Sequence, residues 1–90
     1  MDKEALLQHL NTKGAKCNLQ FSKQTQEIFE RECGFTDEEL EIFRMRGRGW
    51  GIIKISNEMY SLHNEYYSVS RIEARIRSIK TKIAEVLNQG

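Results

Sequence analysis

The last third of the chain carries apolar residues at intervals of three and four positions, which is the spacing of one face of an α-helix. One continuous helix from about Glu65 to Leu87 fits this pattern. A later start at Arg71 is the alternative, because Ser70 and Glu73 also form a capping-box pair. The apolar positions are Leu62, Tyr66, Val69, Ile72, Ile76, Ile79, Ile83 and Val86, and Ile72 and Ile76 are expected to be core residues.

The composition is that of one small helical domain. The chain has 90 residues, of which 39% are hydrophobic and 30% charged, and it has no proline. Ninety residues suggest a single domain, and the absence of proline favours uninterrupted helices. We therefore expect an all-α domain over residues 1–90, in which 1–34 form an N-terminal helical extension and 35–87 form the core unit.

Two short elements are expected in the N-terminal extension. A helix over residues 2–12 would bury its leucines on one face, and a second helix from about Lys23 to Cys33 would begin at Ser22 as its N-cap. Between them, residues 17–21 alternate between apolar and polar side chains. A lone strand would have no partner, so an extended segment packed on the helices is the preferred interpretation.

The clearest helix start in the sequence is at Thr36. Glu39 follows three residues later, so the two side chains can form a capping box, and Phe35 and Leu40 can form the accompanying hydrophobic staple. This helix is expected to run to about Met45 and to bury Leu40, Ile42 and Phe43.

A shorter helix over residues 51–60 is expected to bury Ile52, Ile55 and Met59 before the pattern breaks between Tyr60 and His63. Asn64 is a plausible N-cap for the last helix. A compact helix, a turn and a longer basic helix are the layout of a helix-turn-helix, here at about 51–87.

A basic loop, Arg46-Gly47-Arg48-Gly49, ends the capped helix. It has two interpretations: phosphate contacts by Arg46 and Arg48, joined by Lys54, or a solvated helix C-terminus where arginines complement the dipole. Trp50, just beyond the loop, is expected to cover the core rather than to bind a ligand.

Charge is distributed unevenly along the chain. Residues 1–43 carry five basic and nine acidic side chains, a net −4, whereas residues 44–90 carry nine basic and four acidic side chains, a net +5. This asymmetry indicates a polyanion-binding end. Ordinary fluctuation in composition is the alternative explanation.

The face of the last helix opposite its apolar stripe combines basic and small residues. Small side chains let a helix approach a DNA groove, and an arginine can fork onto guanine. A solvated charged face is the plain alternative. The residues expected to contact DNA are Tyr66, Tyr67, Ser70, Arg71, Ala74, Arg75, Arg77 and Lys80, with Arg46, Arg48 and Lys54 on phosphates.

The stretch Thr36–Ile83 resembles region four of bacterial sigma factors and related helix-turn-helix regulators. The resemblance implies a small bacterial or phage transcription regulator that places its last helix in the DNA major groove. It also implies RNA polymerase or another transcription protein as a partner. The similar segments are Thr36-Asp37-Glu38-Glu39-Leu40 with Phe43-Arg44-Met45-Arg46, then Ile55-Ser56-Asn57-Glu58-Met59, then Ile72-Glu73-Ala74-Arg75.

The chain departs from that family at its turn. The segment between Met59 and Val69 is about three residues longer than the tight turn of a helix-turn-helix. If Val69 matches the family's buried aliphatic position, the base-contacting positions fall on Tyr66, Tyr67, Ser70 and Arg71. The family's arginine and glutamate at these positions are absent, so no promoter preference follows from the resemblance.

The alternative function is a helical interaction or dimerisation module without DNA binding, whose seam, including Ile83 and Val86, packs on another helix. An enzyme is not expected, because the glycines of the basic loop lack the lysine and serine or threonine of a P-loop. No cofactor or metal is expected either, since Cys17 and Cys33 lack zinc-site spacing. Without a signal peptide or a membrane span, a cytoplasmic protein with reduced thiols is expected.

Overall fold

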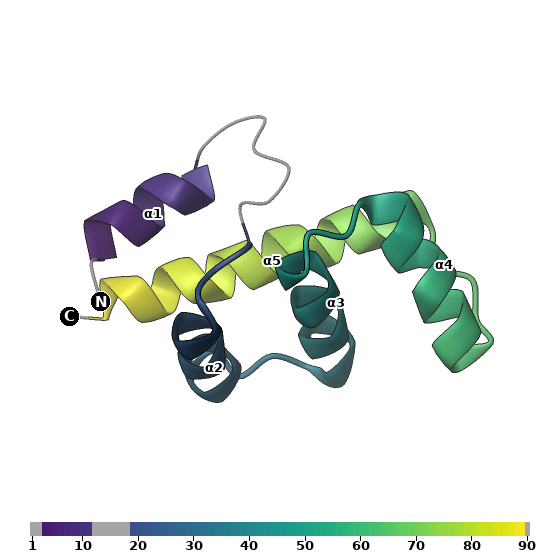
Figure 1. Cartoon of the computed structure of the whole chain (residues 1–90), viewed down its shortest axis with the longest axis horizontal. Helices are drawn as coiled ribbons and strands as arrows, with labels where there is room; N and C mark the ends of the chain where they lie inside the picture. The colour runs from purple at the N-terminus through teal and green to yellow at the C-terminus, as the bar shows by residue number, and fades with distance from the viewer. Residues whose placement is uncertain (1–2, 12–18, 90) are drawn as a thin grey trace.

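The structure is a computed structural model that describes residues 3–11 and 19–89, and five α-helices make up most of these residues. They are α1 (Lys3–Asn11), α2 (Lys23–Glu32), α3 (Asp37–Gly47), α4 (Ile52–His63) and α5 (Val69–Asn88) (Figure 1). The all-α class is confirmed. Within the described ranges, no helix has both the length and the apolar character needed to cross a membrane.

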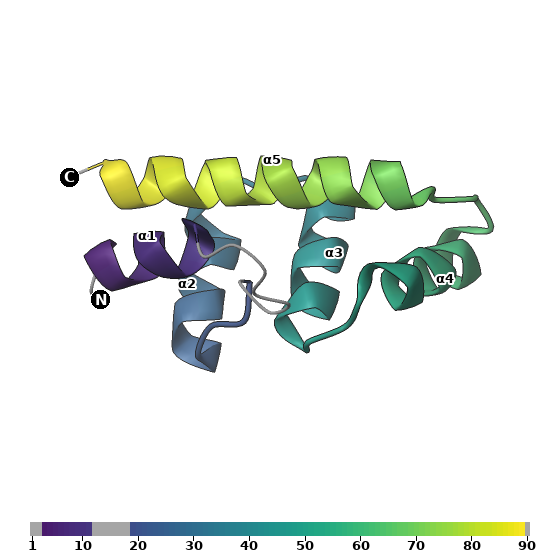
Figure 2. The ribbon, with the colours of Figure 1, turned by 90° about the horizontal axis from the view of Figure 1, so that it is seen from above.

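Three of the other helices pack on the long helix α5. In Figure 2 the remaining helices lie on one side of α5, and its contacts are with α1, α3 and α4. Ile72, Ile79 and Ile83 are fully inaccessible, and Ile76 is 7% exposed. The predicted isoleucine stripe therefore forms the centre of the core, and none of the other four described helices covers the opposite side of α5 (Figure 2).

Aromatic residues fill the space between α2 and α3. The Phe21 ring meets the Phe29 ring edge to face at a centroid distance of 5.0 Å, and Phe35 lies 5.0 Å from Phe43. Leu19 is fully buried. Residues 19–21 therefore form a non-helical segment packed on the helices, as expected, whereas Cys17 lies outside the described residues.

Both predicted N-caps of the shorter helices are present. The Thr36 hydroxyl accepts from the Glu39 N–H at 3.2 Å, and the Thr36 N–H donates to the Glu39 carboxylate at 2.9 Å, which completes the capping box. Ser22 likewise accepts from the Thr25 N–H. The helix that Thr36 starts runs to Gly47, beyond the expected end at Met45, and Leu40 is only partly buried.

The boundary between α4 and α5 differs from the prediction. Tyr60–His63 continue α4, and Asn64, in the left-handed region at φ 50°, is the C-cap of α4 rather than an N-cap. The next helix starts at Val69, because the Ser68 hydroxyl accepts from the Arg71 N–H at 3.1 Å. Both predicted starts, Glu65 and Arg71, are therefore wrong, since apolar spacing alone cannot identify which serine caps the helix.

We expect Thr36→Ala to lower the free energy of unfolding by about 1 kcal/mol, because the Glu39 N–H loses its capping acceptor. Thr36→Ser is the matched control, since it retains the hydroxyl and should retain most of the stability. Urea denaturation of the three proteins measures the effect. Equal midpoints for the alanine variant and the parent would contradict the role of this cap.

We expect Ile72→Ala to lower the free energy of unfolding by about 2–5 kcal/mol, because it opens a cavity in a fully buried site. The control is Ile53→Ala on α4, whose side chain is 65% exposed and whose loss should change stability by less than about 0.5 kcal/mol. Similar thermal unfolding of both variants would show that the α5 stripe is not the core.

Candidate nucleic-acid interface

The arginines on the α3-facing flank of α5 are already paired with carboxylates. Arg71 lies 3.1 Å from Glu38 through Nε and 3.1 Å from Glu65 through Nη1, and Arg75 lies 3.3 Å from Glu38 through Nε. Both arginines were predicted to contact DNA. Their charges are compensated within the domain, so they add little net positive potential on this flank.

The two predicted tyrosines have opposite environments. Tyr66 is 72% exposed, whereas Tyr67 is 5% exposed and part of the core. Arg71 stacks over the Tyr67 ring at 4.0 Å, and burial raises the pKa of the Tyr67 hydroxyl. The Tyr67 carbonyl accepts a hydrogen bond from Ser56, which fixes the turn against α4. Tyr67 therefore stabilises the turn, and only Tyr66 is accessible to a ligand.

Glu39 is a buried carboxylate that joins α3 to α5. It accepts hydrogen bonds from Ser78 at 2.6 Å and from Lys82, in addition to its bond with Thr36. Burial alone would raise the pKa of the Glu39 carboxyl, but these hydrogen bonds outweigh burial and lower the pKa to about 2. The carboxylate therefore stays ionised and holds the two helices in one relative position.

The outer face of α5, opposite the isoleucine stripe, remains accessible. Ser70, Glu73 and Arg77 are exposed there, and Ala74 is partly buried. Ser70 and Ala74 thus occupy the positions at which small side chains were expected. Glu73 places one negative charge on the same face.

Three of the predicted phosphate-binding residues gather around Trp50, just after α3. The Lys54 ammonium lies 4.2 Å from the centroid of the indole ring, and the Arg48 guanidinium carbon lies 5.8 Å from it. Arg46 Nη1 donates to the Trp50 carbonyl at 2.9 Å. Trp50 also packs against the core, as predicted, so one side chain both covers the core and supports cations.

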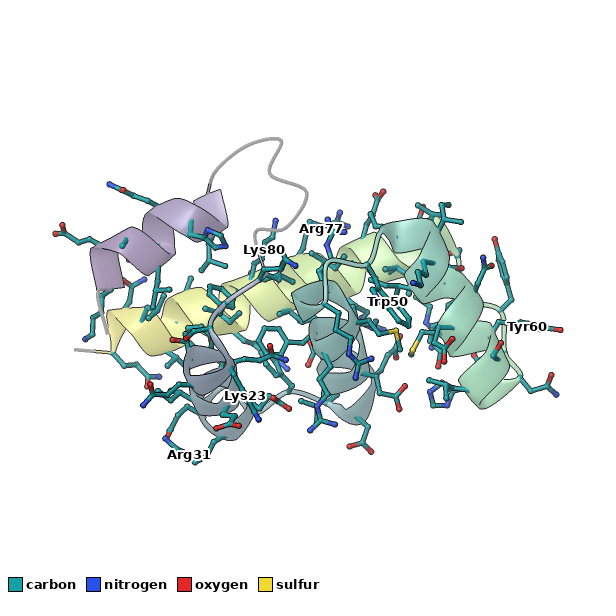
Figure 3. The ribbon with its side chains drawn as sticks, viewed as in Figure 1. Lys23, Arg31, Trp50, Tyr60, Arg77 and Lys80 are labelled. Atoms are coloured by element: carbon teal, nitrogen blue, oxygen red, sulfur yellow. The ribbon has the colours of Figure 1, made fainter. Side chains whose placement is uncertain are left out.

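Two predicted residues of α5 extend this group. Burial, and after it the charge of Arg46, lowers the pKa of the Lys80 ammonium group. Arg77 and Lys80 project from the same edge of α5 in Figure 3. We refer to Arg46, Arg48, Lys54, Arg77 and Lys80 together as the basic surface.

The basic surface lacks counter-ions. Over residues 3–11 and 19–89, none of its five members has an ion pair, whereas Arg44, Arg71, Arg75 and Lys82 are all paired with glutamates. An uncompensated group of cations attracts polyanions and increases their association rates. Each of these five residues was predicted individually from the sequence, but no local pattern indicates that they are separated from Arg71 and Arg75.

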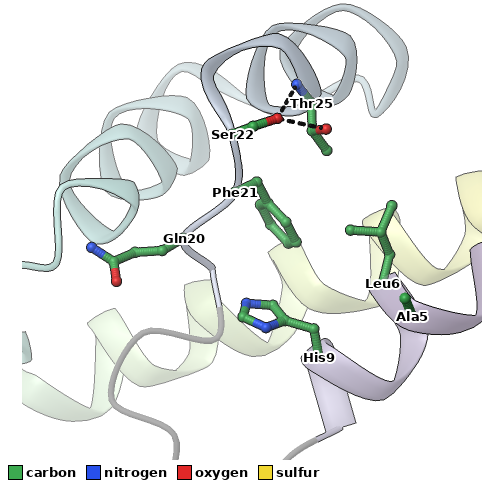
Figure 4. A pocket seen from close by; sticks show the side chains of 7 residues that line it. All are labelled: Ala5, Leu6, His9, Gln20, Phe21, Ser22 and Thr25. Carbon is green, nitrogen blue, oxygen red and sulfur yellow. Dashed lines mark hydrogen bonds between the residues drawn. The ribbon is translucent and has the colours of Figure 1, made fainter. Parts of the chain in front are cut away.

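A hollow of about 340 Å³ lies elsewhere, between α1 and the start of α2 (Figure 4). His9 is the one titratable side chain among its lining residues, and its ring lies 5.3 Å from Phe21.

Among the described residues, no group of three or more histidine, cysteine, aspartate or glutamate side chains could hold a metal ion. Burial, followed by the nearby Glu32 carboxylate, raises the pKa of the Cys33 thiol to about 11, so the thiol is protonated at neutral pH.

No protein-family model matches the chain, and no curated protein or solved structure matches it either.

We expect Glu39 to make the stability of the domain depend on pH. Because the folded pKa of about 2 lies below the ordinary value of 4.5, its stabilisation is complete above that value and is lost as the pH falls towards 2. Compared with Glu39→Gln, the parent should lose up to about 3 kcal/mol of unfolding free energy over this window. Urea titrations of both proteins at several pH values measure the difference, and parallel pH profiles would exclude this role.

Proposed function

We propose that this domain is a bacterial or phage transcription regulator that binds double-stranded DNA, and that it is a binding protein rather than an enzyme. The observation that carries the proposal is the basic surface, whose five cations form no ion pair with any of the described residues. Phosphate contacts supply most of the affinity of such proteins for DNA. Arg46, Arg48, Lys54 and Lys80 are the phosphate contacts in this proposal.

We further propose that α4, the turn of residues 64–68 and α5 act as a helix-turn-helix. In support, α4 packs on α5 while the outer face of α5 remains without a covering helix (Figure 2). A helix inserted into the major groove needs such a free face. The proposed groove contacts are Tyr66, Ser70, Ala74 and Arg77. Tyr67, Arg71 and Arg75 leave the set because their side chains are occupied within the domain.

A protein partner is the second proposed function, and it has its own supporting observation. Ile53, Tyr60, Leu62 and Tyr66 on α4 and the following turn are each more than half exposed. RNA polymerase or another transcription protein is the proposed partner. The seam predicted for a helix-mediated homodimer is less suitable, because Ile83 is fully buried by the chain's own helices.

Binding of a random duplex of about 20 base pairs, followed by fluorescence anisotropy at increasing salt, tests the proposal. We expect Lys54→Gln/Lys80→Gln to reduce the log–log salt slope by about 2, since each lost phosphate contact removes about 0.9. Lys23→Gln/Arg31→Gln is the matched control, because it removes the same charge from α2, on the opposite edge of the view in Figure 3. No binding by the parent at about 100 μM protein and low salt would refute DNA binding.

Selection of bound sequences from a random duplex pool tests the helix-turn-helix separately. We expect Arg77→Lys to alter the preferred sequence with little loss of non-specific affinity, because lysine keeps the charge but lacks the bidentate fork. An unchanged preference would place Arg77 on the DNA backbone and not in the groove.

A further inference from the structure

Glu73 is an exposed glutamate of α5 whose carboxylate is not engaged within the described part of the domain. It forms no ion pair with any residue of the ranges 3–11 and 19–89. The capping box that Ser70 and Glu73 could have formed is absent, because the Ser68 hydroxyl caps α5 two residues earlier. Glu73 also lies beyond the first turn of α5, where an acidic side chain would complement the helix dipole. Its charge is therefore available to a ligand.

Glu73 lies on the same uncovered side of α5 as the side chains proposed to enter the major groove (Figure 2). Arg77 follows it after four positions, which is about one helical turn, and the small side chains of Ser70 and Ala74 lie beside it. A glutamate four positions before an arginine is the order that favours an ion pair within a helix. Arg77 nevertheless has no ion pair in the described part of the chain. The open face thus presents one acceptor and one donor, both unoccupied, a turn apart.

The chemistry of the major groove limits what such a carboxylate can bind. A carboxylate that meets a polyanion is repelled, and a hydrogen bond from the ligand is needed to offset this cost. The major groove offers two kinds of donor, the N4 amino group of cytosine and the N6 amino group of adenine. Adenine places its N7 acceptor beside N6, where a carboxylate is repelled, whereas the neighbouring ring position of cytosine carries only hydrogen. A glutamate in the groove therefore favours cytosine.

We infer that Glu73 is a specificity-determining residue, which selects cytosine in the bound sequence by accepting a hydrogen bond from its N4 amino group. This inference rests on the proposed DNA binding. Arg77, one turn further along α5, acts in the opposite sense as a donor to guanine. At positions without a matching cytosine the Glu73 carboxylate has no donor and repels the duplex, so it also acts against unmatched sequences.

Selection of bound sequences from a random duplex pool by the full chain tests this role. We expect the parent to select cytosine at one position. We expect Glu73→Gln to shift that position to adenine, because an amide can pair with N6 and N7 of adenine together. The other selected positions should not change. A change in stability alone would not convert one base preference into another.

The size of the effect follows from two duplexes, the selected one and one in which thymine replaces the cytosine. We expect the parent to prefer the first by about tenfold, and Glu73→Ala to bind both equally. Glu85→Gln is the matched control and should keep the preference of the parent. Glu85 is also exposed and forms no ion pair with the described residues, but it lies about three turns further along α5 and about 120° around its axis.

Cytosine retained at the same position after Glu73→Gln would overturn the assignment, and so would an equal shift in Glu85→Gln. Loss of the cytosine preference without a gain of adenine would still assign the acceptor to Glu73. A parent that binds duplexes without selecting cytosine would overturn this inference and leave the proposed function intact. A parent that binds no duplex at all would refute both.

Discussion

The buried carboxylate of Glu39 fixes how α3 crosses α5, and the surface of the domain depends on that crossing. The Glu39 carboxylate accepts a hydrogen bond from the Thr36 N–H at the start of α3, and it also accepts hydrogen bonds from Ser78 and Lys82 of α5. A buried carboxylate is stable only when its hydrogen bonds are complete. These bonds limit the rotation of α5 about its own axis. The direction in which each remaining side chain of α5 points is thereby set.

This rotation divides the cations of α5 into two groups. Arg71 and Arg75 point towards the acidic start of α3, where Glu38 binds both. Arg77 and Lys80 point the other way, towards an edge where no carboxylate is paired with them (Figure 3). Arg75 and Arg77 are two positions apart, which corresponds to more than half a turn of a helix. One of these arginines is therefore paired within the domain, whereas the other points away from it.

The features that the sequence predicted well are local ones. The capping box of Thr36 and Glu39 and the isoleucine stripe of α5 depend on spacings of three and four residues within one helix. The turn was predicted wrongly because Asn64, expected to be the N-cap of the last helix, adopts a left-handed conformation at the end of α4. Asparagine is common in both positions, so the residue type alone does not distinguish them. The residues predicted for the candidate site include some that are accessible and some whose side chains are engaged within the domain. The sequence could not separate the two groups, because the pairing of Glu38 with Arg71 spans 33 positions and leaves no local pattern.

The lack of ion pairs at the basic surface, among the described residues, does not come from a shortage of acids in the chain. The protein has 13 acidic and 14 basic side chains, so the acidic side chains are nearly numerous enough to pair with every cation. Two of these acids, Glu38 at the start of α3 and Glu65 in the turn, instead share Arg71. Arg77 and Lys80 form no ion pair with any described residue, although Arg71, Arg75 and Lys82 of the same helix are all paired with glutamates. Unpaired cations on one side of a helix whose other side is paired create a local positive potential, which attracts a polyanion and supports the proposal of DNA binding.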